Sequence, residues 1–264
     1  MKRREFGLSC LATCLAAVGG GMNVSCAYSA EEEASEEKKL RILLVVGGHG
    51  YDKENLHAML RDCPNSTFEE ITIPEKQDML KPGLSEKYDV LVFHDQSFFE
   101  LSDEQKANLE ALWGEEGMPT VMLHHSLISH PEYPLFREIF GAQFLLRDTE
   151  INGRIYQKST YLRPTDLNVY IVARKHPITE GVSDFSLNDE VFKNVYFNPH
   201  IDVLATTDHP ESDVPVLWTW SYKKSPVFGM IQGDAGGAFN DPNYRKLFYQ
   251  GLRWVVAQKS LAAL

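Results

Sequence analysis

The sequence predicts an α/β fold, with a mostly parallel β-sheet that carries helices on both faces. Short apolar runs recur along the chain, and their length suits central strands that are buried on both faces of a parallel sheet. Segments with a helical spacing of apolar residues alternate with these runs. From residue 40 to residue 141 the order is strand, helix, strand, strand, helix, strand, helix, which favours parallel strands and two helical layers.

Three of the apolar runs are expected to be neighbouring parallel strands. They are Leu40–Val46, Tyr88–Phe93 and Thr120–Leu123. Helices are expected at Lys53–Arg61 after the N-cap candidate Asp52, after the capping-box pattern that begins at Ser102, and around Leu135–Phe140. Thr120–Leu123 is wholly apolar or β-branched and opens into a histidine-rich loop, which is typical of a central strand.

The alternation of strand and helix patterns stops at residue 142, and residues 142–175 are expected to form a β excursion. A turn at residues 151–153 favours a hairpin, and residues 155–162 and 167–173 are predicted as strands outside the main sheet. Three further strands and a closing helix are expected at Val203–Thr206, Val214–Trp220, Val227–Gln232 and Pro242–Val256. The α/β domain is therefore expected to span residues 40–258, with a short tail at 259–264.

The first 30 residues are typical of an export signal. Lys2, Arg3 and Arg4 precede an apolar stretch, rich in glycine and alanine, that ends in small residues suited to cleavage. The run Arg3-Arg4-Glu5-Phe6 also resembles a twin-arginine signal, with an ordinary secretory signal as the alternative. We therefore expect a periplasmic or extracellular protein that begins with a disordered linker at residues 31–39 and has no membrane segment after cleavage.

Composition and charge narrow the range of partners. The chain has 264 residues, 43% hydrophobic and 24% charged, which is ordinary for a soluble globular protein. Its formal net charge of −11 disfavours nucleic acid and anionic membrane surfaces as partners. Cleavage of the leader leaves Cys63 as the one cysteine, which excludes an internal disulfide and a cysteine-based metal cluster. A homo-oligomer and a monomer both stay open.

Polar residues gather where several predicted strands end. They are His49 and Tyr51 after the first strand, Asp95 after Tyr88–Phe93, His124 and His125 after Thr120–Leu123, and Asp234 after the last strand. In a parallel sheet these ends share one edge, where ligands bind. We expect His49, Asp95, His125 and Asp234 to face one pocket as catalytic groups, with Tyr51 near its rim. The alternative is that each side chain caps a strand or helix end through local hydrogen bonds.

The residue types at this edge indicate acid/base or metal chemistry. Imidazole titrates near neutral pH and is a common transition-metal ligand, so His49 and His125 are the first choices as ligands of a divalent cation. Neither belongs to a close helical pair such as H-E-x-x-H, so a metal and metal-free proton transfer remain alternatives. A hydrolase with Ser126 as nucleophile is disfavoured because the G-x-S-x-G elbow is missing.

An ordered set of segments resembles the trehalose-utilisation (ThuA-like) family. The set is His176-Pro-Ile-Thr-Glu-Gly181, Asp189-Glu190, Pro215-Val-Leu-Trp218, Gly233 before Ala238-Phe239, and Gly251-Leu-Arg-Trp254. The resemblance covers residues 40 to 258 and implies a flavodoxin-like sheet similar to that of class I glutamine amidotransferases. It also implies a role in carbohydrate metabolism, on a sugar or 3-keto sugar, with a small carbohydrate as ligand.

Two departures from the family pattern bear on function. Amidotransferases place a nucleophilic cysteine after the central strand, where this chain has His124-His125-Ser126, so it is not a glutaminase of that type. Many family members carry Gly-His where this chain has Gly233-Asp234, so a carboxylate replaces a histidine. Two functions stay open: an exported enzyme that uses acid/base chemistry, with or without a metal, and a non-catalytic protein that binds a carbohydrate or a partner.

Further residues are candidates for substrate contacts, together with Tyr51. His124 adjoins a catalytic candidate, and His176 either lies near the rim of the pocket and binds substrate or orients a turn. Asp189 and Glu190 are adjacent in a strand and point to opposite faces, so at most one faces the site, and Glu190 is preferred. Trp218 either stacks on a sugar face or packs in the core.

Overall fold

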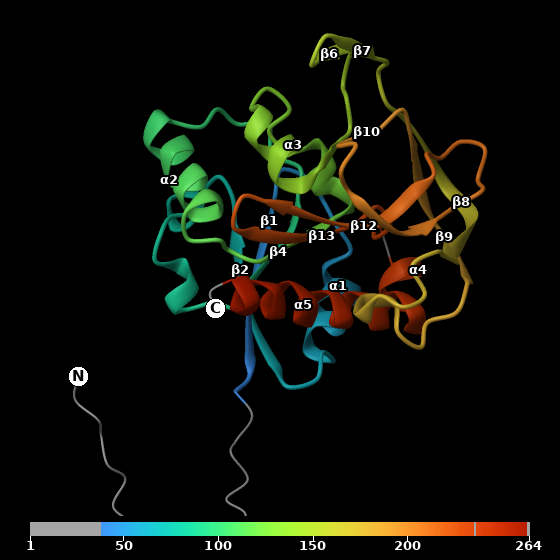
Figure 1. Ribbon diagram of the computed structural model, residues 1–264, viewed down its shortest axis with the longest axis horizontal. Coiled ribbons are helices and arrows are strands. Elements are labelled where there is room, and N and C mark those ends of the chain that lie inside the picture. Colours follow the sequence, from blue (N-terminus) through green and yellow to red (C-terminus); the bar gives the residue numbers. More distant parts are fainter. Residues whose placement is uncertain (1–37, 235, 263–264) are drawn as a thin grey trace, which may run out of the picture. The chain divides into compact units, whose positions relative to one another are not determined.

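A nine-stranded mixed sheet runs through the computed structural model, which describes residues 38–234 and 236–262 (Figure 1). Its strand order is β2-β1-β3-β4-β13-β12-β11-β8-β9. The strands that pair in parallel are β2 (Ser66–Thr72), β1 (Leu40–Gly47), β3 (Val90–Asp95), β4 (Thr120–Leu123) and β13 (Ser225–Met230). Antiparallel pairing continues through β12 (Pro215–Tyr222), β11 (Asp202–Thr206), β8 (Thr160–Ile171) and β9 (Phe185–Lys193).

The parallel half confirms the three neighbouring strands that the sequence predicts. β1, β3 and β4 lie side by side, and every residue of β3 and β4 is buried. Such burial is expected where helices cover both faces of a sheet. The predicted leader and most of the predicted linker, at residues 1–37, lie outside the described residues.

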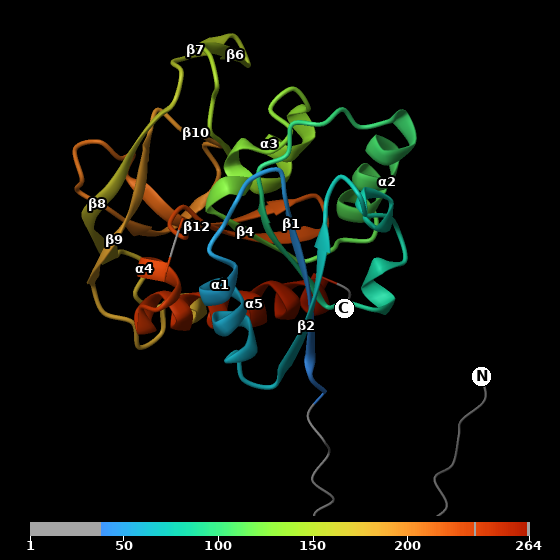
Figure 2. The same ribbon diagram turned by 180° about the vertical axis from the view of Figure 1, so that it is seen from behind.

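Helices cover both faces of the sheet, as predicted (Figures 1 and 2). α1 (Lys53–Arg61), α4 (Gly236–Phe239) and α5 (Pro242–Ala262) share one apolar core with one face of the sheet. α2 (Asp103–Gly114) and α3 (Pro134–Phe140) share a second core with the other face. The predicted caps are present: the Asp52 side chain accepts the N–H of Asn55, and Ser102 and Gln105 form a capping box.

The antiparallel half differs from the sequence prediction. We expected two strands at residues 155–162 and 167–173 outside the main sheet, but the single strand β8 pairs with β11 inside it. The register between β8 and β9 shifts between Leu162 and Thr165. This irregularity accommodates Pro164, which has no N–H for the ladder and interrupts the strand pattern in the sequence.

The predicted hairpin does stand apart from the main sheet. It consists of β6 (Thr149–Ile151) and β7 (Arg154–Tyr156), and a second small pair joins β5 (Ala142–Gln143) to β10 (Tyr196–Phe197). Short 3-10 turns lie at Gln77–Met79, Leu84–Glu86, His124–Ile128 and Pro177–Thr179. The turn at His124–Ile128 follows β4 directly and therefore shapes the loop at the carboxyl edge of the sheet.

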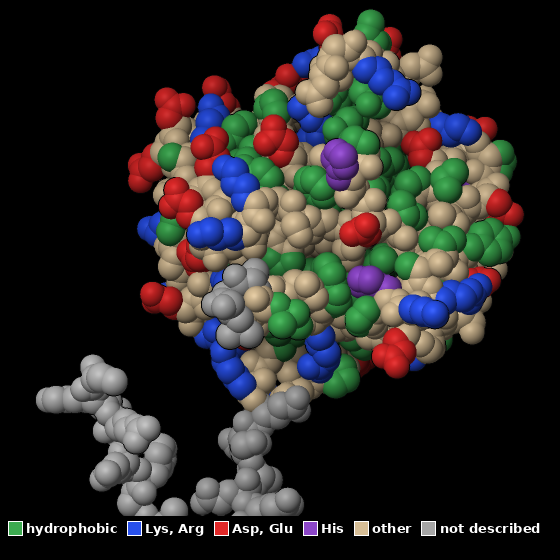
Figure 3. All heavy atoms as spheres, in the orientation of Figure 1, with side chains coloured by type: hydrophobic (Ala, Val, Ile, Leu, Met, Phe, Trp, Pro, Cys, Tyr) green, Lys and Arg blue, Asp and Glu red, His purple; other side chains and the backbone are tan. Residues whose placement is uncertain are grey.

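The closing helix is longer than predicted. α5 continues past Val256 to Ala262 and takes in residues 259–262 of the expected tail, because the added residues include good helix formers such as Ala257, Gln258 and Lys259. Within the described part of the chain, no helix has both the length and the apolar character needed to cross a membrane. On the face seen in Figure 3, acidic and basic side chains are interspersed.

Replacing Gly251 by alanine should destabilise the fold. A Cβ at this position of α5 would lie 2.2 Å from the ring of Phe228 in β13. Overpacking costs typically about 1–3 kcal/mol, against a helix-propensity gain of about 1 kcal/mol, so we expect a net loss of up to about 2 kcal/mol in urea unfolding. Gly50→Ala, whose Cβ meets nothing within 4 Å, is the control. Equal stability of the two variants would contradict the close approach of α5 to the sheet.

Candidate metal centre

Several strands deliver side chains to one place at the carboxyl edge of the sheet. β1, β4 and β13 run in the same direction, and His49, the pair His124 and His125, and Asp234 follow their ends. β9 is last in the strand order, but it lies beside α4 in both views (Figures 1 and 2). Its Glu190 therefore reaches the same place.

Four side chains form the centre of this site: His124, His125, Glu190 and Asp234. One donor atom from each lies within 4.8 Å of those of the others. His124 Nε2 is 3.1 Å from Glu190 Oε2 and 3.7 Å from Asp234 Oδ1, and His125 Nε2 is 3.4 Å from the same Asp234 oxygen. Ligands placed tetrahedrally at about 2.1 Å from a zinc-like cation lie about 3.4 Å apart. The spacing therefore fits one divalent cation held by two imidazoles and two carboxylates.

The local backbone fixes the orientation of His124. This residue adopts a φ of 35°. Positive φ angles are rare for residues other than glycine and cluster at functional sites. Its Nδ1 lies 2.6 Å from the carbonyl oxygen of Ile231, so Nδ1–H donates there and Nε2 faces the carboxylates. Burial alone lowers the pKa of His124, but Glu190 and Asp189 raise it above its usual value. Nε2 is therefore placed to carry either a proton or a cation.

Two further histidines pack against His125. The ring centroids of His49 and His94 lie 4.5 Å and 5.2 Å from that of His125. His94 Nε2 donates to the carbonyl oxygen of Gly233 at 2.9 Å, which ties β3 to the loop after β13. Burial lowers the pKa of His125 to about 4 and that of His94 to about 3. Both rings are neutral at pH 7, the form in which imidazole binds a metal.

Asp234 and Arg163 lie on the open side of the site. Their side chains are 22% and 46% exposed, whereas that of His124 is fully buried. Arg163 Nη1 lies 3.4 Å from Asp234 Oδ1 and 3.9 Å from Glu190 Oε2. The bond from His125, aided by the charges of His124 and Arg163, lowers the pKa of Asp234 to about 2. A molecule that approaches from solvent thus meets a carboxylate beside a guanidinium.

The buried carboxylate of Asp189 anchors the loop that carries Asp234. It accepts the backbone N–H of Glu190 at 2.6 Å and those of Gly233 and Asp234 at 3.2 Å each. Burial raises the pKa of Asp189, against the lowering effect of His124. One side chain therefore sets the positions of two members of the four-residue group.

Comparison with known proteins agrees with this architecture. A family model described as "ThuA: Trehalose utilisation" matches residues 41–255. The chain belongs to the ThuA family. The resemblance seen in the sequence is thereby confirmed, the fold is α/β and class I glutamine amidotransferase-like, and ThuA membership supports a carbohydrate-related role.

Solved structures show the same fold at low sequence identity. A thua-like protein from Parabacteroides merdae has a TM-score of 0.65 at 16% identity, over 83% of this chain and 90% of that one. One from Bacteroides uniformis has a TM-score of 0.60 at 16% identity, over 84% and 93%. A cytoplasmic protein, STM1381, from Salmonella typhimurium has a TM-score of 0.54 at 16% identity, over 81% and 99%. A search of curated protein sequences found no match.

In this ThuA-family chain, three of the four predicted catalytic residues come together and the fourth does not. His49, His125 and Asp234 meet at the site, whereas Asp95 is fully buried under the loop after β4. Asp95 accepts the hydroxyl protons of Ser126 at 2.9 Å and Ser129 at 2.6 Å. Burial raises its pKa. Asp95 thus holds the loop in place, and we reassign it from catalysis to structure. Ser126, already disfavoured as a nucleophile, is engaged in that bond.

Three predicted substrate contacts also take other roles. The Tyr51 hydroxyl donates to Glu70 at 2.9 Å, although its ring lies 5.6 Å from that of His94. His176 Nδ1 accepts the N–H of Ile178, and its ring packs beside Trp254 of α5, so it caps a turn. Trp218 is fully buried and donates to the carbonyl oxygen of Phe140 at 2.9 Å. For His176 and Trp218 the structure agrees with the alternatives given above: His176 orients a turn, and Trp218 packs in the core.

The ligand set also differs from the predicted pair of His49 and His125. His49 is exposed and its ring is tilted against that of His125 without joining the four-donor group, while His124 and Glu190, expected as substrate contacts, belong to it. The sequence analysis missed Arg163. The sequence marks this position only through the neighbouring Pro164, which interrupts the strand pattern. His94 was given no role in the site, although this residue stands among the polar residues at the end of β3.

Proposed function

We propose that this ThuA-family protein is a metal-dependent enzyme that acts on a sugar or an oxidised sugar. The observation that supports it best is the group of four donor atoms, one each from His124, His125, Glu190 and Asp234, within 4.8 Å of one another. Two nitrogen and two oxygen donors suit zinc, manganese or iron better than a hard cation such as magnesium. The family's carbohydrate-related role supplies the substrate class.

The surrounding residues support proton transfer next to a sugar carbonyl. A bound divalent cation supplies a Lewis acid that polarises oxygen atoms. Arg163 is half-exposed at the mouth of the site, and a guanidinium carries five N–H donors, enough to serve a substrate oxygen as well as Asp234. His49 is exposed beside His125 and would accept the proton from the carbon next to the carbonyl. Asp234, which pairs with His125 and Arg163, keeps a negative charge at the open side of the site.

The alternative is a protein that binds a carbohydrate without turning it over. It is favoured by the near-complete burial of His124, His125 and Glu190, which leaves a small open side for chemistry. A panel of keto-sugars and disaccharides, assayed for turnover by NMR with the metal-loaded protein, separates the two. Slow exchange of a carbon-bound proton with solvent deuterium supports the enzyme, and binding without any exchange supports the alternative.

The metal should stabilise the protein in a pH-dependent manner. We expect about one divalent cation per chain in protein purified without chelator, measured by elemental analysis. Saturation at about 100 times Kd should add about 2.7 kcal/mol to the free energy of unfolding. Affinity should fall as pH falls from about 8 to 5, because a proton on His124 Nε2, whose pKa the carboxylates raise, competes with the cation. An affinity that does not change over this range would contradict imidazole ligation.

We further infer that the protein is exported before it acts. The basic residues Lys2, Arg3 and Arg4 before an apolar stretch support this inference. N-terminal sequencing of native protein from the periplasmic or culture fraction should find a start between residues 28 and 31. Recovery of the chain in the cytoplasm with Met1 in place would contradict export.

A further inference from the structure

A second hollow lies at the same edge of the sheet, away from the four-donor group. It is a groove of about 610 Å³. Its walls come from the loop after β3, the first turn of α2, the loop after β4 and the segment after β5: Phe98, Phe99, Glu100, Leu101, Lys106, His130, Pro131, Glu132, Tyr133 and Leu146. Sites for small molecules typically enclose about 300–1,000 Å³. The groove is therefore large enough for one or two sugar rings.

His130 gives this groove a buried polar group that the fold does not satisfy. It is 4% exposed, and among the described residues its Nε2 has no hydrogen-bond partner. Its ring lies between those of Phe99 and Phe136, at 4.7 Å and 4.5 Å. Its φ of 47° is unusual for a side chain with a Cβ. Buried polar atoms in native proteins are nearly always paired, so this nitrogen indicates a missing partner.

The protonation state of His130 identifies the kind of partner. Burial lowers its pKa to about 4, while a backbone hydrogen bond with Phe99 acts in the opposite direction. A bond that raises the pKa of imidazole is one in which the ring donates, so in the neutral ring the other nitrogen, Nε2, is an acceptor. The missing partner is therefore a donor, such as a hydroxyl group.

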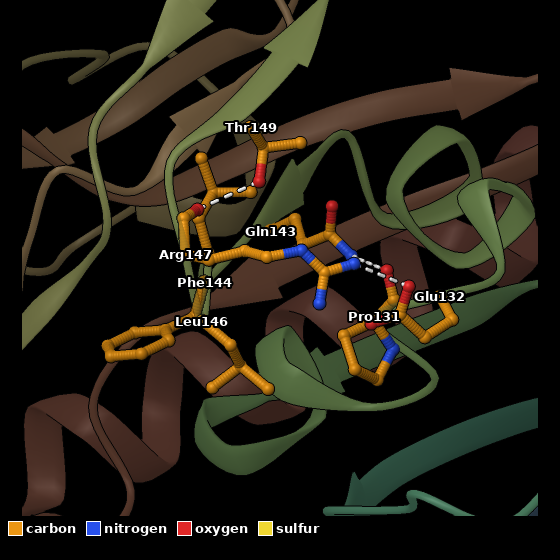
Figure 4. Close-up of a pocket in the computed structure, with 8 residues that line it drawn as sticks. Pro131, Glu132, Gln143, Phe144, Leu146, Arg147 and Thr149 are labelled. Carbon is orange, nitrogen blue, oxygen red and sulfur yellow. Dashed lines mark hydrogen bonds and ion pairs between the residues drawn. The ribbon is translucent and has the colours of Figure 1, made fainter.

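The walls combine aromatic faces with charged groups. Phe98 and Leu146 are 54% and 41% exposed. Lys106 lies over the Tyr133 ring, 6.0 Å from its centroid. Glu132 also lines a smaller pocket, drawn in Figure 4, where its carboxylate pairs with Arg147 at 2.7 Å. Aromatic faces attract the C–H groups of a sugar ring, and carboxylates accept its hydroxyl protons.

We propose that this groove binds a pyranose ring of a neutral sugar, with the apolar face of the ring on Phe98 and Tyr133 and a hydroxyl donated to His130 Nε2. His130 lines the groove and its Nε2 is buried in this structure, so binding requires the neighbouring side chains to shift. Glu100 and Lys106 both line the groove and Glu132 is paired with Arg147, so the groove has no excess of positive charge for a phosphorylated sugar. The proposal deepens the proposed function by adding a sugar site, but it does not require the metal.

Calorimetry with methyl α-D-glucopyranoside, on the full-length protein with and without excess EDTA, tests the site. We expect Phe98→Ala to weaken binding about fivefold to tenfold, since a stacked ring is lost. His130→Asn, which tolerates the left-handed backbone and removes the ring acceptor, should weaken it similarly. Val214→Ala, an equally exposed apolar residue outside the groove, is the control and should bind as the parent does.

The outcomes separate this site from the metal centre. Wild-type affinity in both groove variants, or no binding of the glycoside to the parent protein, overturns the groove. Binding that EDTA abolishes and Phe98→Ala leaves unchanged also overturns it, while the proposed function stands. Binding that persists in EDTA and falls in Phe98→Ala supports the groove even if elemental analysis finds no metal, in which case the proposed function fails alone.

Discussion

Replacing His125 with glutamine should abolish metal retention while leaving the metal-free fold nearly as stable as before. The change removes one of two imidazoles, and a neutral amide oxygen is a much weaker ligand for a zinc-like cation. Loss of a supporting residue near a metal already costs about 10- to 100-fold in affinity, so loss of a ligand should cost at least about 100-fold. Elemental analysis after gel filtration and titration with zinc measure the loss.

The same variant separates a functional role from a structural one. In EDTA we expect its free energy of unfolding to stay within about 1 kcal/mol of that of the parent. The reason is that, among the described residues, the His125 ring pairs with Asp234 and packs against the rings of His49 and His94. His200→Gln, at an exposed histidine in the loop before β11, is the matched control. Retained metal, or a large loss of stability in EDTA, would assign His125 to structure.

The position of the site was predictable because parallel strands end at one edge. The polar residues after β1, β4 and β13 are close in space for this reason, and His49, His125 and Asp234 were expected together. The direction of each side chain was not predictable. At the end of β3, His94 points towards His125 and the next residue, Asp95, points towards the loop serines. Residues at a strand end alternate between faces, and the sequence does not say which one faces the site.

The rule that adjacent residues of a strand point to opposite faces predicted only part of the roles of Asp189 and Glu190. We expected one of the two to serve the site, and Glu190 does bond His124 directly. Asp189 serves it as well, through the backbone N–H groups of Gly233 and Asp234. The loop after β13 comes close to β9 although these strands are far apart in the sheet order. The proximity of this loop to β9 depends on the twist and curvature of the whole sheet, which local sequence patterns do not predict.

The buried position of Trp218 has a signal in the sequence, which is the glycine opposite it in the neighbouring strand. Trp218 in β12 lies directly opposite Gly229 in β13, and a Cβ on this glycine would come within 2.3 Å of the indole. A glycine in a strand often marks a place where a large neighbour needs room. A tryptophan paired with a glycine across a predicted hairpin therefore favours the core over a sugar-binding surface.

Replacing Asp189 with alanine should have the largest combined effect on fold and site. Three backbone N–H groups, those of Glu190, Gly233 and Asp234, would lose their acceptor in a buried setting. Each buried donor without a partner costs about 1–3 kcal/mol, so we expect unfolding in EDTA to be easier by about 3 kcal/mol or more. Metal affinity should fall at least about 10-fold as well, because Glu190 and Asp234 lose their fixed positions.

Two companion variants test this assignment. Asp189→Asn keeps one oxygen acceptor and should recover part of both losses, since it can still accept from one or two of the N–H groups. Asp166→Ala removes an exposed carboxylate that bonds Asn188 across the same strand pair, and it should change stability and metal affinity little. If Asp189→Ala loses stability but binds zinc as tightly as the parent, the carboxylate supports the fold alone. The ligands would then be positioned by their own packing, with the contact between His124 and Ile231 as the remaining anchor.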